Sequence, residues 1–88
     1  MRLPIHVEGH EGALLGFEKN IYTLRSPAAF APGQPLHIHV LATPEPFELE
    51  ARTIGVKRRE DGDFLVRARA INLRREHREV LASASGEE

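Results

Sequence analysis

The chain has 88 residues, 41% of them apolar, and its 12 Lys and Arg residues against 13 Asp and Glu residues give a formal charge of −1. This length suits one domain, which buries only about 60% of its unfolded surface and leaves little space for a deep enclosed active site. Because the chain contains no cysteine, disulfides, thiolate catalysis and cysteine-based zinc sites are excluded. No apolar run approaches the roughly 18 residues of a membrane span and no signal-peptide pattern opens the chain, so we expect a cytoplasmic protein without membrane contact.

The first half of the chain predicts short strands separated by glycine and proline turns. Residues 2–8 alternate apolar and polar side chains, which is the period of a half-buried strand. Residues 20–24 are rich in aromatic and β-branched side chains that favour a strand, and residues 26–33 form a loop with two prolines. The next predicted strand has an inward set of side chains, Leu36, Ile38 and Val40, and an outward set, His37 and His39.

The second half predicts a long hairpin with its tip near Gly62. If the loop has three residues and Gly62 adopts the left-handed conformation, the apolar side chains of both strands lie on one side. Val56 then lies opposite Val66, and Ile54 lies opposite Ala68. A two-residue loop would turn charged side chains into the core, so the three-residue loop is preferred.

The two halves of the first hairpin strand differ in parity. Residues 47–51 place apolar side chains at odd positions, whereas Ile54 and Val56 occupy even positions. A one-residue bulge near Arg52 and Thr53 is therefore needed to keep both sets inside.

A short helix is expected to close the domain. Asn72 is the predicted N-cap, and a helix of about ten residues should end between residues 83 and 86. The elements together predict a mainly β fold, a small six-stranded antiparallel β-barrel with a C-terminal α-helix, at residues 1–83, followed by a flexible tail at residues 84–88. The predicted apolar stripe of the helix is Leu73, His77, Val80 and Leu81.

Basic side chains are concentrated in the second half of the chain. Residues 52–79 hold nine basic and five acidic side chains, and ten of the twelve basic residues of the chain are arginine. Three interpretations remain open: a solvated face with local ion pairs, an acidic protein partner, or nucleic acid. Nucleic acid is the least favoured, because binders of this size usually add stacking aromatic residues and net positive charge. The candidate partner-binding residues are Arg67, Arg69, Arg74, Arg75 and Arg78.

Several segments share apolar and turn patterns with one family. They are Leu24-Arg25-Ser26-Pro27, Phe30-Ala31-Pro32-Gly33, Pro35-Leu36, residues 47–52, residues 64–73 and residues 76–81. These segments resemble the strands, loop and closing helix of the PilZ domain, the six-stranded barrel of bacterial cyclic-di-GMP signalling. The resemblance covers most of the chain and implies a non-enzymatic regulatory or adaptor domain.

The motifs with which that family binds its ligand are incomplete in this chain. The family uses two arginines spaced R-x-x-x-R and a turn of the form D/N-x-S-x-x-G. Arg2 matches the second arginine, and the first has no counterpart. The turn falls on Gly16, Glu18 and Ile21, none of which matches, and Arg67 stands where the family usually has a glycine. The resemblance therefore implies an atypical member that acts through protein–protein contact without cyclic-di-GMP; the alternative is a cyclic-di-GMP effector with an atypical site that uses Arg2.

Metal binding and catalysis are weaker alternatives. His37 and His39 share an outward strand face near His6, which partly resembles a histidine-rich metal site, but a solvated face accounts for them more simply. No serine stands in a nucleophile-elbow or general-base setting. We therefore expect no catalytic residue, no metal and no cofactor.

Overall fold

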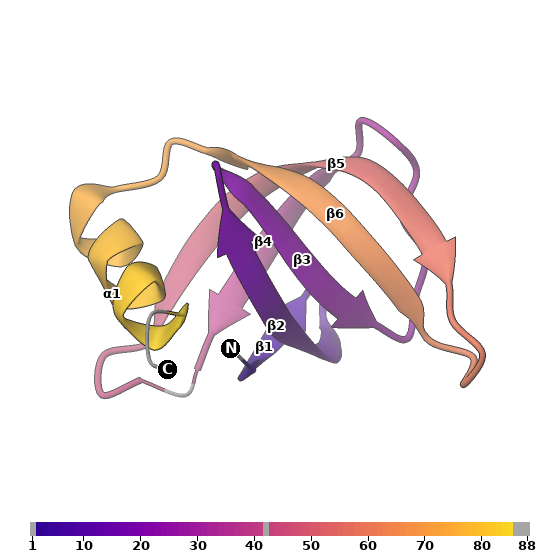
Figure 1. The fold of residues 1–88 in the computed structure, drawn as a ribbon, viewed down its shortest axis with the longest axis horizontal. Coiled ribbons are helices and arrows are strands. Elements are labelled where there is room, and N and C mark those ends of the chain that lie inside the picture. Colours follow the sequence, from indigo (N-terminus) through magenta and orange to yellow (C-terminus); the bar gives the residue numbers. More distant parts are fainter. Residues whose placement is uncertain (1, 42, 86–88) are drawn as a thin grey trace.

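The computed structural model describes residues 2–41 and 43–85, which fold into a closed barrel of six antiparallel strands and one helix (Figure 1). The elements are β1 (Leu3–Val7), β2 (His10–Glu18), β3 (Ile21–Ser26), β4 (Pro35–Val40), β5 (Phe47–Arg58), β6 (Phe64–Ile71) and α1 (Arg75–Ser85). Around the barrel the order is β1-β2-β3-β6-β5-β4, and β4 pairs with β1 to close it. The predicted barrel with a C-terminal helix is therefore confirmed.

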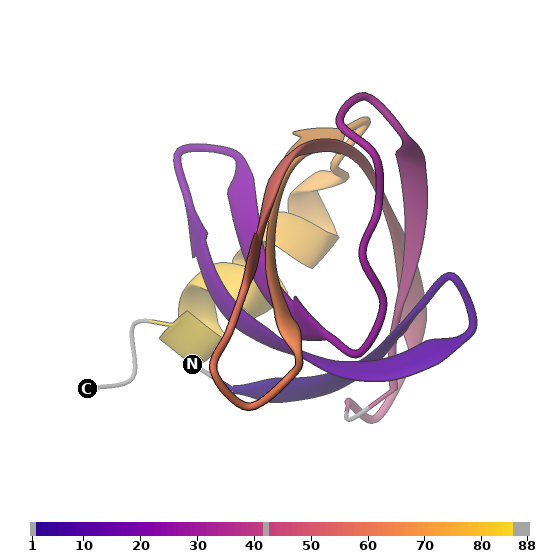
Figure 2. The same ribbon diagram turned by 90° about the vertical axis from the view of Figure 1, so that its right-hand side faces the viewer.

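Alternating side chains fill the interior of the barrel. In β4 the apolar side chains are buried and the two histidines are exposed, as predicted. Figure 2 looks along the barrel, and α1 lies across its far end, where Leu81 is fully buried. The core comprises Ile5, Val7, Leu14, Tyr22, Leu24, Phe30, Leu36, Ile38, Val40, Leu49, Ala51, Val66, Ala68 and Leu81.

The β5–β6 hairpin has the predicted three-residue loop. The Arg59 amide donates to the Asp63 carbonyl oxygen at 2.7 Å, so this pair closes a loop of three residues. Gly62 has a φ of 93°, the left-handed conformation that a glycine adopts at little cost. Val56 pairs with Val66, which confirms the register expected at the end of the hairpin.

The bulge in β5 lies at Ile54, slightly later than predicted. Thr53 pairs with Ala68 and Gly55 pairs with Arg67, so Ile54 is the extra residue. The prediction that Ile54 points inward opposite Ala68 is wrong, because Ile54 is 40% exposed and Thr53 takes the inward place at 3% exposure. Thr53 can be buried because its hydroxyl donates to the Gln34 carbonyl oxygen at 3.0 Å.

The helix begins later than the sequence pattern indicates. Asn72 has a left-handed φ of 52° and is not the N-cap, which corrects the prediction. The first turn instead starts at Arg74, whose carbonyl oxygen accepts from the Arg78 amide at 2.9 Å. Leu73 packs against the core from the preceding linker, outside the helix.

Only part of the predicted helical stripe faces the barrel. His77 stacks on Phe47 with ring centroids 4.2 Å apart, and Leu81 is buried. Val80 is 37% exposed, so its inclusion in the stripe is wrong. The helix continues to Ser85, two residues into the expected tail, and residues 86–88 lie outside the described part of the chain.

Candidate functional site

The outer surface of β6 carries two arginines in alternate positions. Val66 and Ala68 point into the barrel and are fully buried, so Arg67 and Arg69 point outward, and both are exposed. Arg52 of β5 is also exposed and lies directly opposite Arg69. We call these three side chains, Arg52, Arg67 and Arg69, the arginine face.

The register fixes what surrounds the arginine face. On the β3 side, Arg69 lies opposite Ile21 and Arg67 lies opposite Thr23. On the β5 side, Arg67 lies opposite Gly55, the residue that follows the bulge. A Cβ atom built on Gly55 meets nothing within 4 Å, so the surface beside Arg67 is open.

No carboxylate of the described residues forms an ion pair with the arginine face. Arg52 donates one hydrogen bond, from Nη1 to the Gly33 carbonyl oxygen at 2.8 Å, and this contact fixes its guanidinium. Three arginines outside the face do have acidic partners: Arg25 Nη1 lies 3.2 Å from Asp63 Oδ2, Arg59 Nε lies 3.8 Å from Asp61 Oδ2, and Arg74 Nε lies 3.8 Å from Glu76 Oε2.

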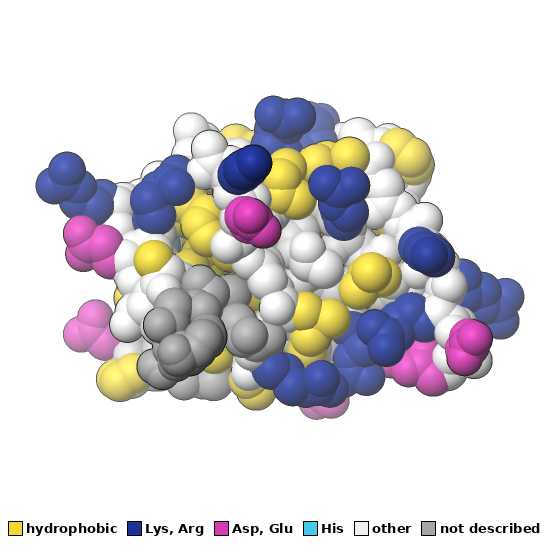
Figure 3. Space-filling view, viewed as in Figure 1, with side chains coloured by type: hydrophobic (Ala, Val, Ile, Leu, Met, Phe, Trp, Pro, Cys, Tyr) yellow, Lys and Arg dark blue, Asp and Glu magenta, His cyan; other side chains and the backbone are white. Residues whose placement is uncertain are grey.

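Apolar side chains lie among these cations. Figure 3 shows hydrophobic side chains at the surface between separate Lys and Arg groups on the side of the molecule that carries β3 and β6. Ile54 is exposed by the bulge, and Ile21, Leu65 and Ile71 are half-buried at outward positions. Exposed arginine beside aliphatic surface is typical of protein interfaces.

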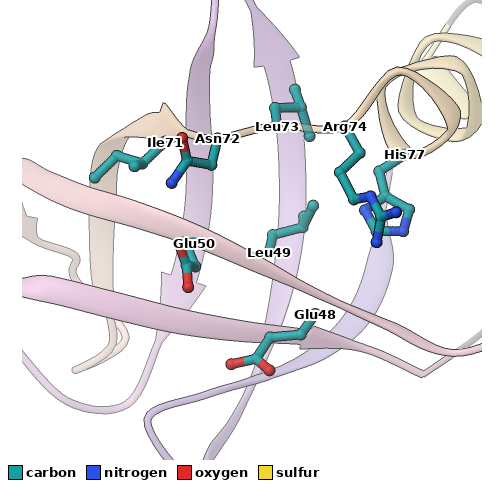
Figure 4. Close-up of a pocket in the computed structure, with 8 residues that line it drawn as sticks. All are labelled: Glu48, Leu49, Glu50, Ile71, Asn72, Leu73, Arg74 and His77. Atoms are coloured by element: carbon teal, nitrogen blue, oxygen red, sulfur yellow. The ribbon is translucent and has the colours of Figure 1, made fainter.

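The remaining predicted partner-binding residues lie at the helix. Arg78 Nη2 donates to Asn20 Oδ1 at 2.7 Å, and the guanidinium lies 5.8 Å from the centroid of the Phe17 ring, so this side chain fastens α1 to the β2–β3 turn. Arg75 is exposed in the first turn of α1. Arg74 lines a depression of about 260 Å³ between β5, the β6–α1 linker and the helix (Figure 4); the other lining residues are Glu48, Leu49, Glu50, Ile71, Asn72, Leu73 and His77.

The three turn positions that the resemblance assigns to ligand binding come together, but Arg2 does not line the same depression. Gly16, Glu18, Ile21 and Arg67 all line one shallow depression of about 350 Å³, next to Lys19, Phe17 and Thr23. Arg2 is exposed just before β1, and its neighbour Leu3 pairs with Leu14 of β2. The depression holds both a carboxylate and two cations, so its charge is mixed.

The predicted histidines lie on β1 and β4 and are paired with glutamates. His6 of β1 lies directly opposite His39 of β4, and their Nε2 atoms are each 4.0 Å from a glutamate, Glu11 and Glu48. His37 Nδ1 lies 3.2 Å from Glu8 Oε2, and the same oxygen accepts from the His37 backbone amide at 2.7 Å. Within residues 2–41 and 43–85, no three histidines or acids gather in a group that could hold a metal ion.

The sequence interpretation missed two members of this surface. Arg52 is one of the nine basic residues at positions 52–79, but its position opposite Arg69 follows only from the register across the bulge. Gly55 carried no functional prediction, because its role depends on lying opposite Arg67.

Comparisons with protein-family models, with curated proteins and with solved structures find no match for this chain. Among the described residues, no helix has the length and apolar character that crossing a membrane requires.

Proposed function

We propose that this chain is a non-enzymatic regulatory or adaptor domain of bacterial signalling, similar to PilZ domains, that binds an acidic surface of another protein. The observation that carries the proposal is the arginine face, where Arg52, Arg67 and Arg69 share one outer surface without an acidic partner among the described residues. The exposed guanidinium groups of Arg67 and Arg69 keep their donors free for a carboxylate of another molecule, and Arg52 adds positive charge beside them.

Two further features support this proposal. The order of six strands and a closing helix agrees with the architecture that the resemblance implies. The serine nearest the barrel, Ser26, is fully buried, and its Oγ accepts a hydrogen bond from the Ala28 amide at 3.1 Å, so it serves the loop conformation and is not presented to a substrate.

Charge reversal of the face tests the proposal. The native chain and an Arg67→Glu, Arg69→Glu variant would be used to capture proteins from cells of the source organism, and captured proteins would be titrated as purified samples. We expect an acidic protein whose binding weakens by at least about tenfold in the variant. Arg58→Glu with Arg59→Glu is the matched control, since it makes the same charge change at the hairpin tip. Equal affinity of all three chains for the captured proteins would show that the arginine face is solvated surface and not a binding site.

Cyclic-di-GMP binding is the second candidate function, because Gly16, Glu18 and Ile21, where the resemblance places the nucleotide-binding turn, line one depression. Arg2 does not line this depression, and none of the three residues matches the turn of the family, so we expect no calorimetric signal when cyclic-di-GMP is titrated at micromolar concentration. A binding curve that disappears in Arg2→Ala would establish the nucleotide function instead.

A further inference from the structure

Two arginines of the arginine face are direct partners across the strand pair β5 and β6. Arg52 and Arg69 are direct cross-strand neighbours on the outer surface, and like charges in such positions destabilise a sheet. Glu50 is two residues from Arg52 on the same surface of β5, yet it forms no ion pair with either arginine. Arg52 is also held in place by the Gly33 carbonyl oxygen. Arg69 has no acidic partner among the described residues, so its guanidinium is free to bind an external anion beside the positive charge of Arg52.

The spacing along β6 indicates what kind of anion fits. Arg67 and Arg69 are two residues apart on one face of a strand, which separates them by about 6.6–6.8 Å. Alternate side chains of an extended peptide have the same spacing. Two acidic residues separated by one residue would therefore place one carboxylate at Arg69 and the other at Arg67.

The open surface at Gly55 gives the second carboxylate room to approach. Gly55 lies opposite Arg67, and its missing side chain leaves free space on the outer surface. Ile21 lies opposite Arg69 and Ile54 is exposed next to Gly55, so aliphatic surface borders the two arginines. The described aromatic side chain of β3, Tyr22, points inward and is buried, so it offers no stacking platform for a nucleic-acid base on this surface.

We infer that the arginine face binds an extended acidic segment of a partner protein in which glutamate or aspartate occupies alternate positions. The inference rests on the proposed function and specifies its ligand. Because the six strands form a closed barrel, the segment finds no free strand edge for backbone pairing, and recognition depends on side chains. Binding should therefore weaken strongly as salt is added.

Two synthetic peptides of identical composition test this inference by NMR titration of the native chain. One peptide alternates glutamate with threonine, and the other carries its glutamates in one block. We expect the alternating peptide to bind about tenfold more tightly and to shift the amides of Gly55, Arg67 and Arg69 most. Equal affinity for the two peptides would overturn the inference and leave the proposed function standing.

Variants locate the contact. Arg67→Gln with Arg69→Gln should lower the affinity for the alternating peptide by at least about tenfold, and Arg58→Gln with Arg59→Gln should change it by less than about twofold. Gly55→Val keeps every charge and adds a side chain in open space, so it should block the second carboxylate and bind at least about fivefold more weakly. If Gly55→Val perturbs the spectrum of the free protein, Gly55→Ala replaces it.

Three further outcomes would overturn the inference. Unchanged affinity of the Gly55 variant for the alternating peptide would show that the peptide does not occupy the open surface. Unchanged affinity in Arg67→Gln with Arg69→Gln would place the peptide elsewhere. Tighter binding of a thymidine oligonucleotide than of the alternating peptide would assign the face to nucleic acid. A loss of partner capture on charge reversal, together with any of these results, would still support the proposed function.

Discussion

Tyr22 shows how the environment of one buried residue sets its chemistry. It is fully buried in the barrel, its ring lies 5.2 Å from that of Phe17, and its hydroxyl has no hydrogen-bond partner among the described residues. Burial raises the pKa of Tyr22 to about 12, and the positive charge of Arg78 partly offsets this rise. The hydroxyl is therefore a cost to the fold, because a buried polar group without a partner loses its hydrogen bonds to water.

Removing that hydroxyl should stabilise the protein. Tyr22→Phe is expected to raise the free energy of unfolding by about 1 kcal/mol, measured by urea denaturation at neutral pH. The ring and its contact with Phe17 are retained in this variant. A loss of stability of similar size would indicate that the hydroxyl has a partner.

Alkaline pH provides a second measurement on the same residue. Below the unfolded pKa of 10.0 the tyrosine is neutral in both states, so its ionisation does not affect stability. As the pH rises from 10.0 to about 12, the unfolded chain loses this proton first, and stability should fall by about 1.4 kcal/mol per pH unit. The Tyr22→Phe variant should lack this contribution. Because Tyr22 is the sole tyrosine, tyrosinate absorbance reports its titration directly.

The bulge in β5 determines which side chains this strand presents to solvent. Without the extra residue, side chains would alternate regularly after Thr53, so Gly55 would point inward and Val56 outward. With it, Thr53 is inside, Ile54 is exposed, and Gly55 lies opposite Arg67. The bulge therefore shapes the arginine face as well as the core.

The two hairpin strands should respond differently to polar substitution. Ile54→Ser is expected to change the free energy of unfolding by less than about 0.5 kcal/mol, because this side chain is already exposed. Val66→Asp should cost about 3–5 kcal/mol, because it buries an unpaired charge. Thermal denaturation measures the stability of both variants. A large loss of stability in Ile54→Ser would indicate that Ile54 is buried and that the bulge lies near Arg52 and Thr53, as the sequence predicts.

The linker between β6 and α1 depends on a left-handed residue. Asn72 has a φ of 52°, a conformation that asparagine tolerates and β-branched residues avoid. Asn72→Val is expected to lower the free energy of unfolding by about 1–2 kcal/mol, whereas Asn72→Gly should be close to neutral. Equal losses in the two variants, measured by urea denaturation, would mean that the side chain of Asn72 matters more than its backbone.

The closed barrel separates charges of opposite sign across the whole molecule. In the strand order β6 lies three places from β1 in either direction, so the two strands are on opposite sides of the barrel. The β1 and β4 side carries His6 and His39 beside glutamates, and the β6 side carries the arginine face. A chain of net charge −1 thus presents one basic side.

Ion-exchange behaviour should reveal this asymmetry. Despite its net negative charge, the chain is expected to be retained on a cation-exchange column at neutral pH, because the arginine face can orient toward the resin. Arg67→Gln with Arg69→Gln should elute at clearly lower salt. Arg58→Gln with Arg59→Gln should shift elution less, because the acids of the hairpin tip already offset those cations. Equal shifts for the two variants would argue against a distinct basic side.

Local sequence patterns alone determined much of this protein. Alternation in β4 and β6, together with a glycine at the hairpin tip, gave the correct faces and the correct three-residue loop. These features depend on neighbours in the chain and on the burial of apolar side chains, which a sequence displays directly. The exposure of Arg67 and Arg69 followed from the same alternation.

Tertiary structure decided the features that depend on distant segments. Thr53 is buried because the Gln34 carbonyl oxygen, from another loop, accepts from its hydroxyl, and this contact moves the bulge to Ile54. Apolar parity favoured Ile54 for the interior, because hydropathy contains no information about such an acceptor. Arg52 faces Arg69 only once the bulge is placed, since one extra residue exchanges the two surfaces of a strand. The sequence therefore determined that the protein is a barrel with outward arginines, and the register across β5 and β6 decided which arginines face one another.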